Sequence, residues 1–353
     1  MGPVRCRHAL GRSGRNSQIL QAAGDYDADI ADPAEGTFLV PVLDAQAAVR
    51  RRRDARGRCA RTAPHRPARR SETQGRQQVT QEIRGKVVAI TGGARGIGLA
   101  TATTLRALGA KIAIGDIDEA AVKESGAARD FEYYARLDVT EQNSFESFLD
   151  EVERALGPID VLINNAGIMP TGRLVDEPDQ LTRRILDINV YGVILGSKLG
   201  LARMLPRKRG HIINIASLAG ETHIPGLATY NASKHAVLGF TDTLREEYRD
   251  SGVRFSSVLP TLTKTELGSG VTAPRLLRPA EPEEIAAAIA GLIATPKSKV
   301  RVTAMAGFIS QVVGLLPEAL GDGLARALGS GRAFLDDVNT EQRRAYEERA
   351  RGV

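Results

Sequence analysis

Short apolar runs alternate with longer segments of helical period between residues 86 and 304. The runs are rich in β-branched residues and are followed by turn residues, which is typical of strands buried on both faces. Because strands that alternate with helices are joined by right-handed crossovers, the pattern predicts a parallel sheet with helices on both sides. The expected strands are 86–91, 110–116, 132–138, 159–167 with its turn, 210–217, 253–260 and 299–304, and the expected helices are 97–108, 141–156, 181–205, 227–250 and 283–294.

This alternation defines a doubly wound α/β sheet, the Rossmann fold, in a single domain over residues 84–305. The ligand of such a sheet lies beyond the carboxyl ends of the strands. Residues 306–353 are expected to form a helical C-terminal extension, with an apolar stretch at 308–316, a helix at 320–328 and a solvated, charged helix at 341–351. Four roles stay open for this extension: extra packing, a cap on a neighbouring subunit, closure of the pocket, or contact with a membrane surface.

The first 83 residues differ from the rest in composition. Residues 1–80 hold 15 Arg, no Lys and 8 Asp or Glu, hence a net charge of +7, while the whole chain carries +6. The segment 1–83 has no sustained apolar period, so it buries too little surface to offset chain entropy and is expected to be disordered. A transit peptide, which the acidic residues between 25 and 32 oppose, a nucleic-acid-binding tail and an over-extended translation start all stay open.

Composition excludes several functions for the remaining chain. Its net charge of −1 (+6 less +7) attracts neither nucleic acid nor anionic lipid, and with no Trp in the chain a stacking surface for nucleic acid is not expected. Both cysteines, Cys6 and Cys59, precede the sheet, so it has no disulfide and no thiolate metal site. This favours a reducing compartment and a cytoplasmic protein. The chain has no apolar run of roughly 18 residues, so no membrane-spanning helix is expected.

The segment TGGARGIG at 91–98 lies between the first expected strand and the first expected helix. Gly92 lets the chain turn sharply, while Gly96 and Gly98 let the backbone approach a ligand and the helix pack close to the sheet. The start of the helix presents free N–H groups and the positive end of its dipole, which suits a pyrophosphate. Strand, glycine turn and helix together predict a dinucleotide-binding site.

Asp116 ends the second expected strand, 24 residues after Gly92. A carboxylate there accepts hydrogen bonds from the ribose hydroxyls of adenosine and repels a 2′-phosphate, which favours NAD over NADP. Arg95 in the glycine turn weakens this preference, because a cation at that place could meet a 2′-phosphate. Exposure of Arg95 to solvent is the alternative.

Ser217 ends the fifth expected strand, Tyr230 follows 13 residues later, and Lys234 four residues after that. Positions i and i+4 share one helix face, so the phenol and the ammonium can point into one cleft. The nearby cation is expected to lower the pKa of the phenol from about 10. These features predict Tyr230 as the general acid and base for an alcohol or carbonyl oxygen held by Ser217. Alone, the Tyr-x-x-x-Lys pair also fits an ordinary surface helix.

The glycine turn, of the form Gly-x-x-x-Gly-x-Gly, together with the order and spacing of Ser217, Tyr230 and Lys234, resembles the short-chain dehydrogenase/reductase family over residues 84–304. The resemblance implies a catalytic domain that transfers hydride between a nicotinamide and a CH–OH carbon. It implies that Asn189 is a fourth catalytic member, which kinks the long helix and holds a water that links Lys234 to solvent. A buried helical Asn with a local partner is the alternative.

The resemblance also implies further cofactor contacts. Asp138 would hold the adenine amino group, although it also suits a helix cap. Asn164 would support the sheet and the next three residues would line the cofactor, although small residues here also suit a turn. Thr261 replaces the glycine that the family usually has after its proline. The complete set of expected cofactor contacts is Gly92, Arg95, Gly96, Ile97, Gly98, Asp116, Asp138, Val139, Asn165, Ala166, Gly167, Tyr230, Lys234, Pro260, Leu262 and Thr265.

These features predict an NAD(H)-dependent oxidoreductase that interconverts a secondary alcohol and a ketone or aldehyde. No metal is expected, because Tyr230 and Lys234 replace a Lewis acid and the histidines are scattered over separate elements. The family resemblance implies a homo-oligomer. A protein that binds NAD(H) as a sensor or scaffold without turnover is the alternative, which gives no reason for the Ser, Tyr and Lys set.

The substrate is expected to contact the segment 262–281 and residues near Ser217. Their apolar bias favours a lipophilic alcohol or ketone, and Gly268, Gly270 and Pro274 favour a lid that orders on binding. The expected substrate contacts are Leu218, His223, Ile224, Leu227, Leu267, Leu276 and Leu277.

Overall fold

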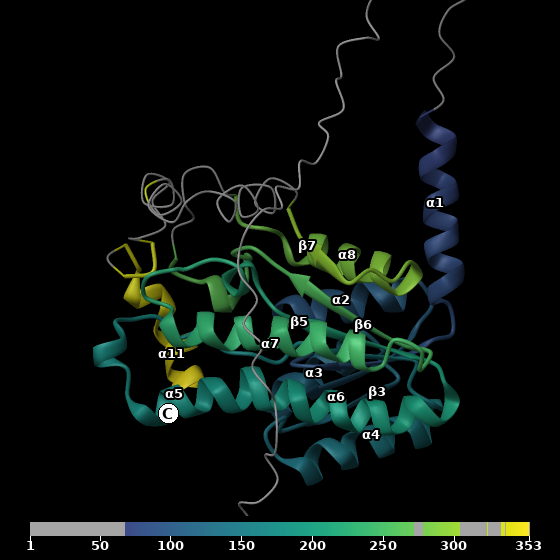
Figure 1. Ribbon diagram of the computed structural model, residues 1–353, viewed down its shortest axis with the longest axis horizontal. Coiled ribbons are helices and arrows are strands. Elements are labelled where there is room, and N and C mark those ends of the chain that lie inside the picture. Colours follow the sequence, from purple (N-terminus) through teal and green to yellow (C-terminus); the bar gives the residue numbers. More distant parts are fainter. Residues whose placement is uncertain (1–67, 272–277, 304–322, 324–332, 336, 353) are drawn as a thin grey trace, which may run out of the picture. The chain divides into compact units, whose positions relative to one another are not determined.

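The computed structural model describes residues 68–271, 278–303, 323, 333–335 and 337–352, which Figure 1 shows in colour. Seven parallel strands form one sheet in the order β3-β2-β1-β4-β5-β6-β7. The predicted doubly wound α/β sheet is therefore confirmed, and its strand order reverses between β1 and β4. The strands are β1 Val87–Thr91, β2 Lys111–Asp116, β3 Tyr133–Arg136, β4 Val161–Asn164, β5 Gly210–Ile215, β6 Val253–Leu259 and β7 Lys299–Arg301.

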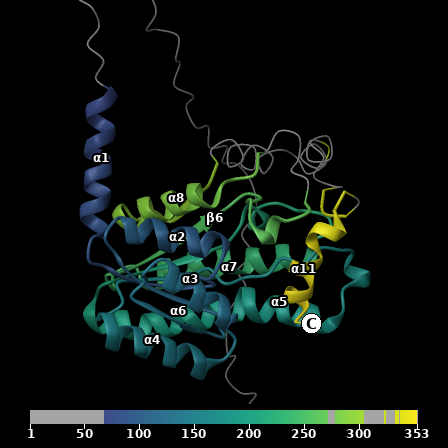
Figure 2. The ribbon, with the colours of Figure 1, turned by 180° about the vertical axis from the view of Figure 1, so that it is seen from behind.

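Helices cover both faces of the sheet, as strands with apolar side chains on both sides require. Helices α2, α3 and α8 pack with one face in a continuous apolar cluster. Helices α4, α6 and α7 pack with the other face, and Figures 1 and 2 show the two layers from opposite sides. Their bounds are α2 Gly96–Ala107, α3 Glu119–Ala128, α4 Gln142–Leu156, α6 Gly192–Met204, α7 Ala228–Glu247 and α8 Pro282–Ala294.

Local sequence explains where these elements begin. All five residues of β1 are buried, as expected of an apolar run between two helix layers. Asp118 precedes helix α3 as its N-cap, and its carboxylate accepts from the Ala121 N–H at 3.0 Å. Helix α8 begins with Pro282 and a capping box formed by Glu281 and Glu284.

Three elements differ from the sequence expectation. Helix α1 (Ala68–Ile83) forms the end of the segment predicted to be disordered, and Ile83 is fully buried in the cluster that contains α8. The pattern misses α3, because alanines and Gly126 give it a weak apolar period. The expected helix 181–205 is divided into α5 (Asp179–Leu186), a π-helical turn (Asp187–Tyr191) and α6. The expected features at 1–67, 308–316 and, apart from position 323, 320–328 lie outside the described residues.

Short 3₁₀ turns connect several of these elements. They are Leu174–Asp176, Leu205–Arg207, Leu218–Gly220 and Glu266–Gly268.

Among the described residues, the stretch Asp179–Arg207 is long and apolar enough to cross a membrane by length and composition. More than half of its apolar window is buried inside the fold. Residues of α6 such as Leu195 and Met204 belong to the apolar cluster under the sheet. The apolar character of this stretch is accounted for by its packing as a core helix.

Helix α11 (Thr340–Arg351) forms where the sequence predicts a charged, solvated helix. It is not solvated on all sides, because the side chain of Arg343 is only 1% exposed. Both views show α11 beside α5, and Arg184 Nε donates to the Ala350 carbonyl at 2.9 Å. Helix α11 therefore packs against the same domain that contains the sheet.

Two helical glycines provide a matched test of this packing. A Cβ at Gly196 of α6 would lie 2.7 Å from the Phe145 ring and closer still to Asn164 Oδ1, whereas a Cβ at Gly239 of α7 would have no atom within 4 Å. We expect Gly196→Ala to lower the free energy of unfolding by about 1–3 kcal/mol through overpacking. Gly239→Ala should raise it by about 0.5–1 kcal/mol. Urea denaturation measures both; equal effects would contradict the close approach of α6 to the sheet.

Candidate active site

A cavity of about 1030 Å³ lies at the carboxyl ends of the strands, on both sides of the point where the strand order reverses. It brings together every predicted cofactor and catalytic residue except Gly98 and Asn189, which are buried and do not line it. The expected substrate contacts Leu218, His223, Ile224, Leu227 and Leu267 also line it. Leu276, Leu277 and Pro274 lie outside the described residues.

The glycine turn has the shape that a pyrophosphate requires. Gly92 and Gly96 have φ of +64° and +53°, which favour glycine. A Cβ at Gly96 would lie 3.2 Å from Thr265 Cγ2, and Gly98 packs directly against the Gly92 carbonyl. The Asn165 amide donates to the carbonyls of Thr91 and Gly92, both at 2.9 Å, and so holds the turn. These glycines leave room at the start of α2, where a dinucleotide phosphate fits.

Two carboxylates and one cation stand where β2 ends. Asp116 accepts from the N–H groups of Ala94 at 3.1 Å and Asp118 at 3.2 Å. Desolvation by burial raises the pKa of Asp116, and these two hydrogen bonds oppose that shift. Arg95 forms an ion pair with Asp118 at 2.6 Å, and the two side chains are 38% and 33% exposed.

The Asp138 side chain both stabilises the turn after β3 and lines the cavity. Its Oδ1 accepts from the Thr140 N–H at 3.0 Å and from the Thr140 hydroxyl at 2.6 Å. Asp138 also lines the cavity. The turn role that the sequence offers as an alternative is thus present, and it leaves the second carboxylate oxygen for a ligand.

Tyr230 and Lys234 project from the first turns of α7 into the cavity and are 6% and 4% exposed. Lys234 Nζ lies 5.6 Å from the centre of the Tyr230 ring and donates to the Ile215 carbonyl at 3.0 Å. Desolvation raises the pKa of Tyr230 to about 12, against a hydrogen bond with Ser217 that lowers it. Desolvation also lowers the pKa of Lys234 to about 8. The expected lowering of the tyrosine pKa is therefore wrong, because desolvation by burial dominates.

Asn189 holds the loop that follows β4. Its Oδ1 accepts from the Ile168 N–H at 2.8 Å, and its Nδ2 donates to the Ile168 carbonyl at 2.9 Å and to Ser233 Oγ at 3.1 Å. The π-helical turn around Asn189 directs this fully buried side chain toward Gly167, where a Cβ would lie 3.1 Å from Oδ1 and 3.6 Å from Lys234 Nζ. Asn189 thus has local partners and also lies beside the lysine.

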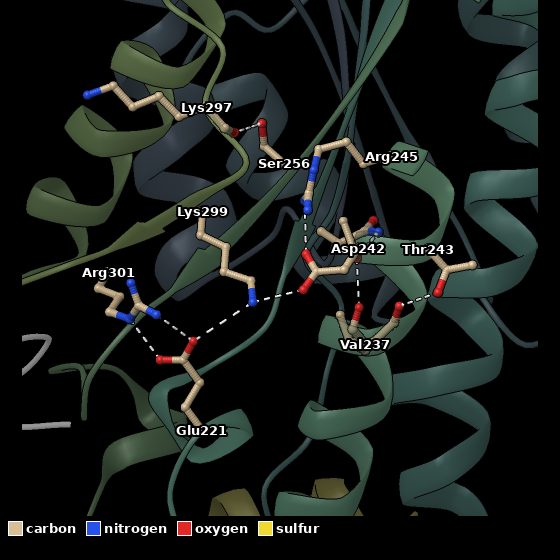
Figure 3. A network of polar contacts seen from close by, with 12 residues as sticks. Glu221, Val237, Asp242, Thr243, Arg245, Ser256, Lys297, Lys299 and Arg301 are labelled. Carbon is tan, nitrogen blue, oxygen red and sulfur yellow. Dashed lines mark hydrogen bonds and ion pairs between the residues drawn. The ribbon is translucent and has the colours of Figure 1, made fainter. Parts of the chain in front are cut away.

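A polar network fixes the chain after Ser217, and the sequence gives no sign of it (Figure 3). The Glu221 carboxylate accepts from Arg301 Nε and Nη2, both at 2.7 Å. Lys299 Nζ lies 2.8 Å from Asp242 Oδ2 and 4.0 Å from Glu221. The network joins the Ser217 loop to β7 and α7, so the strand and the helix position this side of the cavity together.

Four residues of the C-terminal extension complete the cavity, and sequence reasoning misses all of them as site residues. We call this set the C-terminal wall: Phe334, Tyr346, Arg349 and Ala350. Phe334 packs in one apolar cluster with Tyr230 and Met169. Of the roles left open for the extension, the described residues show packing against the domain and a contribution to the cavity wall, and contact with a neighbouring subunit or a membrane surface stays a prediction.

Among the described residues, no group of three His, Cys, Asp or Glu side chains is placed to hold a metal ion. His223 and His235 stack with ring centres 6.0 Å apart. His211 shares a hydrogen bond with Ser256 at 2.8 Å on the sheet.

A doubly wound parallel sheet with this glycine turn, and with a buried Tyr and Lys pair in the same cavity, defines a nucleotide-binding oxidoreductase. Residues 86–275 match the family of short chain dehydrogenases. The chain belongs to the short-chain dehydrogenase/reductase family. The C-terminal wall lies beyond the matched residues.

Relatives and solved structures agree with this assignment. The chain is 36% identical over 199 residues to 2-(S)-hydroxypropyl-CoM dehydrogenase 3 of Xanthobacter autotrophicus, covering 54% of this chain and 76% of that protein. It is 37% identical over 206 residues to a 3-alpha-(or 20-beta)-hydroxysteroid dehydrogenase of Mycobacterium bovis, covering 57% and 79%. A short-chain dehydrogenase/reductase of Burkholderia phymatum in complex with NAD is similar in structure, with a TM-score of 0.60, 26% identity, and coverage of 65% and 93%.

Burial of Lys234 has a consequence for stability. Its pKa is about 8 in the folded protein and 10.5 when unperturbed, so between these values the unfolded chain binds a proton that the folded protein has released. Stability therefore rises with pH over this window. We expect Lys234→Met to exceed the wild type in unfolding free energy by up to about 3 kcal/mol below pH 8.

The excess should decline as the pH rises from 8 toward 10.5, since the wild type then loses its buried charge. Denaturant unfolding at several pH values measures it. A difference in unfolding free energy between variant and wild type that is constant with pH would contradict the lowered pKa of Lys234 in the folded protein.

Proposed function

We propose that this chain is an NAD(H)-dependent oxidoreductase that interconverts a secondary alcohol and a ketone or aldehyde, with Tyr230 as general acid and base. The observation that carries the proposal is one cavity that holds the glycine turn, Ser217, Tyr230 and Lys234 together. A protein that only binds a dinucleotide needs the first of these and not the other three.

The buried tyrosine and lysine suit proton transfer. A bound nicotinamide would supply the hydride acceptor or donor, and the positive charge of its oxidised ring would favour the phenolate form of Tyr230. Tyr230 would give its phenolic proton to a developing alkoxide, or take the proton of an alcohol. Ser217, which lines the same cavity as Tyr230, would hold the same substrate oxygen.

Lys234 and Asn189 would act behind the tyrosine. With a pKa of about 8, Lys234 can take up and release a proton near neutral pH. Asn189 lies close to Lys234 across Gly167 and is the group through which a water could join the lysine to solvent. The role of Asn189 in a proton relay is proposed from its position beside Lys234. Its amide also makes hydrogen bonds with Ile168 and Ser233, so these contacts do not themselves require a relay.

NAD is the proposed cofactor. The carboxylates of Asp116 and Asp118 both line the cavity where β2 ends, and Arg95 is paired with Asp118. A 2′-phosphate would meet two negative charges and a cation already neutralised. The Burkholderia phymatum structure, which contains NAD, supports this choice.

A lipophilic substrate is proposed from the wall around Tyr230. Met169, Leu227 and Phe334 form one apolar cluster with the tyrosine. The Mycobacterium bovis relative is named for hydroxysteroids, which are lipophilic alcohols, and this supports the same class.

A coupled assay tests the proposed reaction. Purified protein with NAD and a panel of lipophilic secondary alcohols should produce NADH, measured by absorbance. Tyr230→Phe should lose about 10²–10⁴-fold in kcat because the proton donor is gone. The variant should still bind NADH, measured by fluorescence titration. Turnover that survives in the variant would exclude Tyr230 as the acid and base, and tight NADH binding without turnover of any alcohol would favour the sensor.

The cofactor choice has its own test. Asp116→Asn keeps an acceptor for the Ala94 N–H and removes the charge, so the ratio of kcat/KM with NAD to that with NADP should fall by roughly tenfold or more. Asp118→Asn should lower the NAD-to-NADP ratio of kcat/KM more than Asp116→Asn does, because it also releases Arg95 toward a 2′-phosphate. Adding Arg95→Gln should restore part of it. A ratio that stays the same in all three variants would exclude these residues as the selectivity determinants.

A further inference from the structure

Tyr346 brings a second phenol to the wall of the cavity that contains Tyr230. Its hydroxyl oxygen accepts from the Met169 N–H at 2.6 Å. Met169 in turn packs in the apolar cluster of Tyr230 and Phe334. One backbone unit therefore connects the hydroxyl of Tyr346 with the side chains around the proposed acid and base.

The ring of Tyr346 is held in place by Arg343. The guanidinium carbon lies 4.7 Å from the ring centre, a cation–π contact. Arg343 donates to the carbonyls of Leu267 at 2.8 Å and Ser269 at 2.9 Å, and also to the Met169 carbonyl. These three carbonyls belong to two separate loops beside the cavity. A shift of α11 would break the hydrogen bonds that Arg343 makes with them, so the phenol of Tyr346 is held in one position.

A carboxylate completes this clamp. Glu347 accepts from Arg343 Nε at 2.7 Å and from the Thr171 N–H at 3.2 Å. A buried guanidinium needs such a partner, because an unpaired buried charge is costly. The donors of Arg343 are thereby engaged with the protein, which leaves the phenol of Tyr346 as the polar group that this part of α11 offers to the cavity.

The hydrogen-bond capacity of Tyr346 is only half used among the described residues. A phenol accepts and also donates one hydrogen bond. The Met169 N–H occupies the oxygen as acceptor, while no described residue accepts the phenolic proton. Desolvation raises the pKa of Tyr346 well above its ordinary value, so the group keeps its proton and acts as a donor.

We propose that Tyr346 is a specificity-determining residue that donates a hydrogen bond to a second oxygen of the substrate, separate from the oxygen served by Tyr230. This inference rests on the proposed oxidoreductase function and narrows its substrate class. The substrate is a lipophilic ketone or secondary alcohol that carries a further acceptor oxygen, such as an ether, carbonyl or hydroxyl group. A site built to hydrogen-bond a substrate group discriminates against analogues that lack it.

Pairs of ketones that differ by one atom test the proposal. The 2-, 3- and 4-methoxycyclohexanones are compared with the 2-, 3- and 4-ethylcyclohexanones, in which a methylene replaces the ether oxygen. An ether oxygen can only accept, so it reports a donor in the wall. We expect the wild type with NADH to prefer the methoxy ketone in at least one pair by about tenfold in kcat/KM. Tyr346→Phe should reduce that preference to about one.

A control variant separates recognition from loosening of the wall. Glu347→Gln weakens the attachment of α11 and keeps the phenol, so any change in kcat/KM should be shared by both members of a pair and leave the preference in place. Loss of the preference in Tyr346→Phe alone supports the proposal. A wild type without preference, or a preference that survives in Tyr346→Phe, overturns it.

The same pairs are also measured as ligands of the NADH-saturated Tyr230→Phe protein, by the shift in melting temperature. A methoxy preference in binding, together with no turnover of any ketone or alcohol by the wild type, would reject the proposed reaction and keep the role of Tyr346. Turnover of both members of each pair at equal rates, with equal binding, would support the proposed reaction and reject the role of Tyr346.

Discussion

A chain of buried amides and hydroxyls crosses the sheet beneath the site, and the placement of the site depends on it. Asn164 Nδ2 donates to Asn214 Oδ1 at 2.8 Å and lies 3.3 Å from Ser197 Oγ, and Asn214 Nδ2 donates to Thr241 Oγ1 at 2.9 Å. The chain joins α6, β4, β5 and α7 in the buried interior, where an unpaired amide is costly. Asn164 and Asn214 are also direct partners in the parallel register. Shifting either strand by one residue would break the chain and displace the helix that supplies both proposed proton-transfer side chains.

The sheet and the amide chain hold charged and polar groups in a buried environment. Tyr230 and Lys234 are both shifted away from their charged forms by desolvation, and the Ile215 carbonyl is the one described hydrogen-bond acceptor of the ammonium. At the other end of the cavity, Arg95 pairs with Asp118 and Arg349 pairs with Glu266 at 2.5 Å. These pairs are partly exposed and contribute little to stability. Each pair neutralises its arginine, so neither guanidinium is an unpaired cation at this end of the cavity.

The cofactor-binding turn and the proposed proton-transfer residues could be predicted from the sequence, because each of them belongs to a short local pattern. The glycine turn and Asp116 each follow from a short pattern at a strand end, and the Tyr-x-x-x-Lys pair follows from a short pattern on one helix. The parallel topology then brings the strand ends to one edge of the sheet. The C-terminal wall has no such pattern. Residues 341–351 show a charged pattern typical of a solvated helix, while Arg343 binds backbone carbonyls more than 70 positions away. Any residue type can supply a carbonyl, so no sequence signal marks these partners.

Helix α11 is attached in a different way from the helices that cover the sheet. The two faces of the sheet are joined to their helices by continuous apolar clusters, whereas α11 is held mainly by hydrogen bonds and ion pairs of Arg343, Glu347 and Arg349. Local opening of a polar attachment does not require the apolar core to open. The proposed selection of the substrate by Tyr346 therefore rests on a polar attachment, while the sheet and its glycine turn rest on the apolar core. Substitutions in α11 would then alter the proposed substrate preference over evolutionary time and leave the folding of the sheet intact.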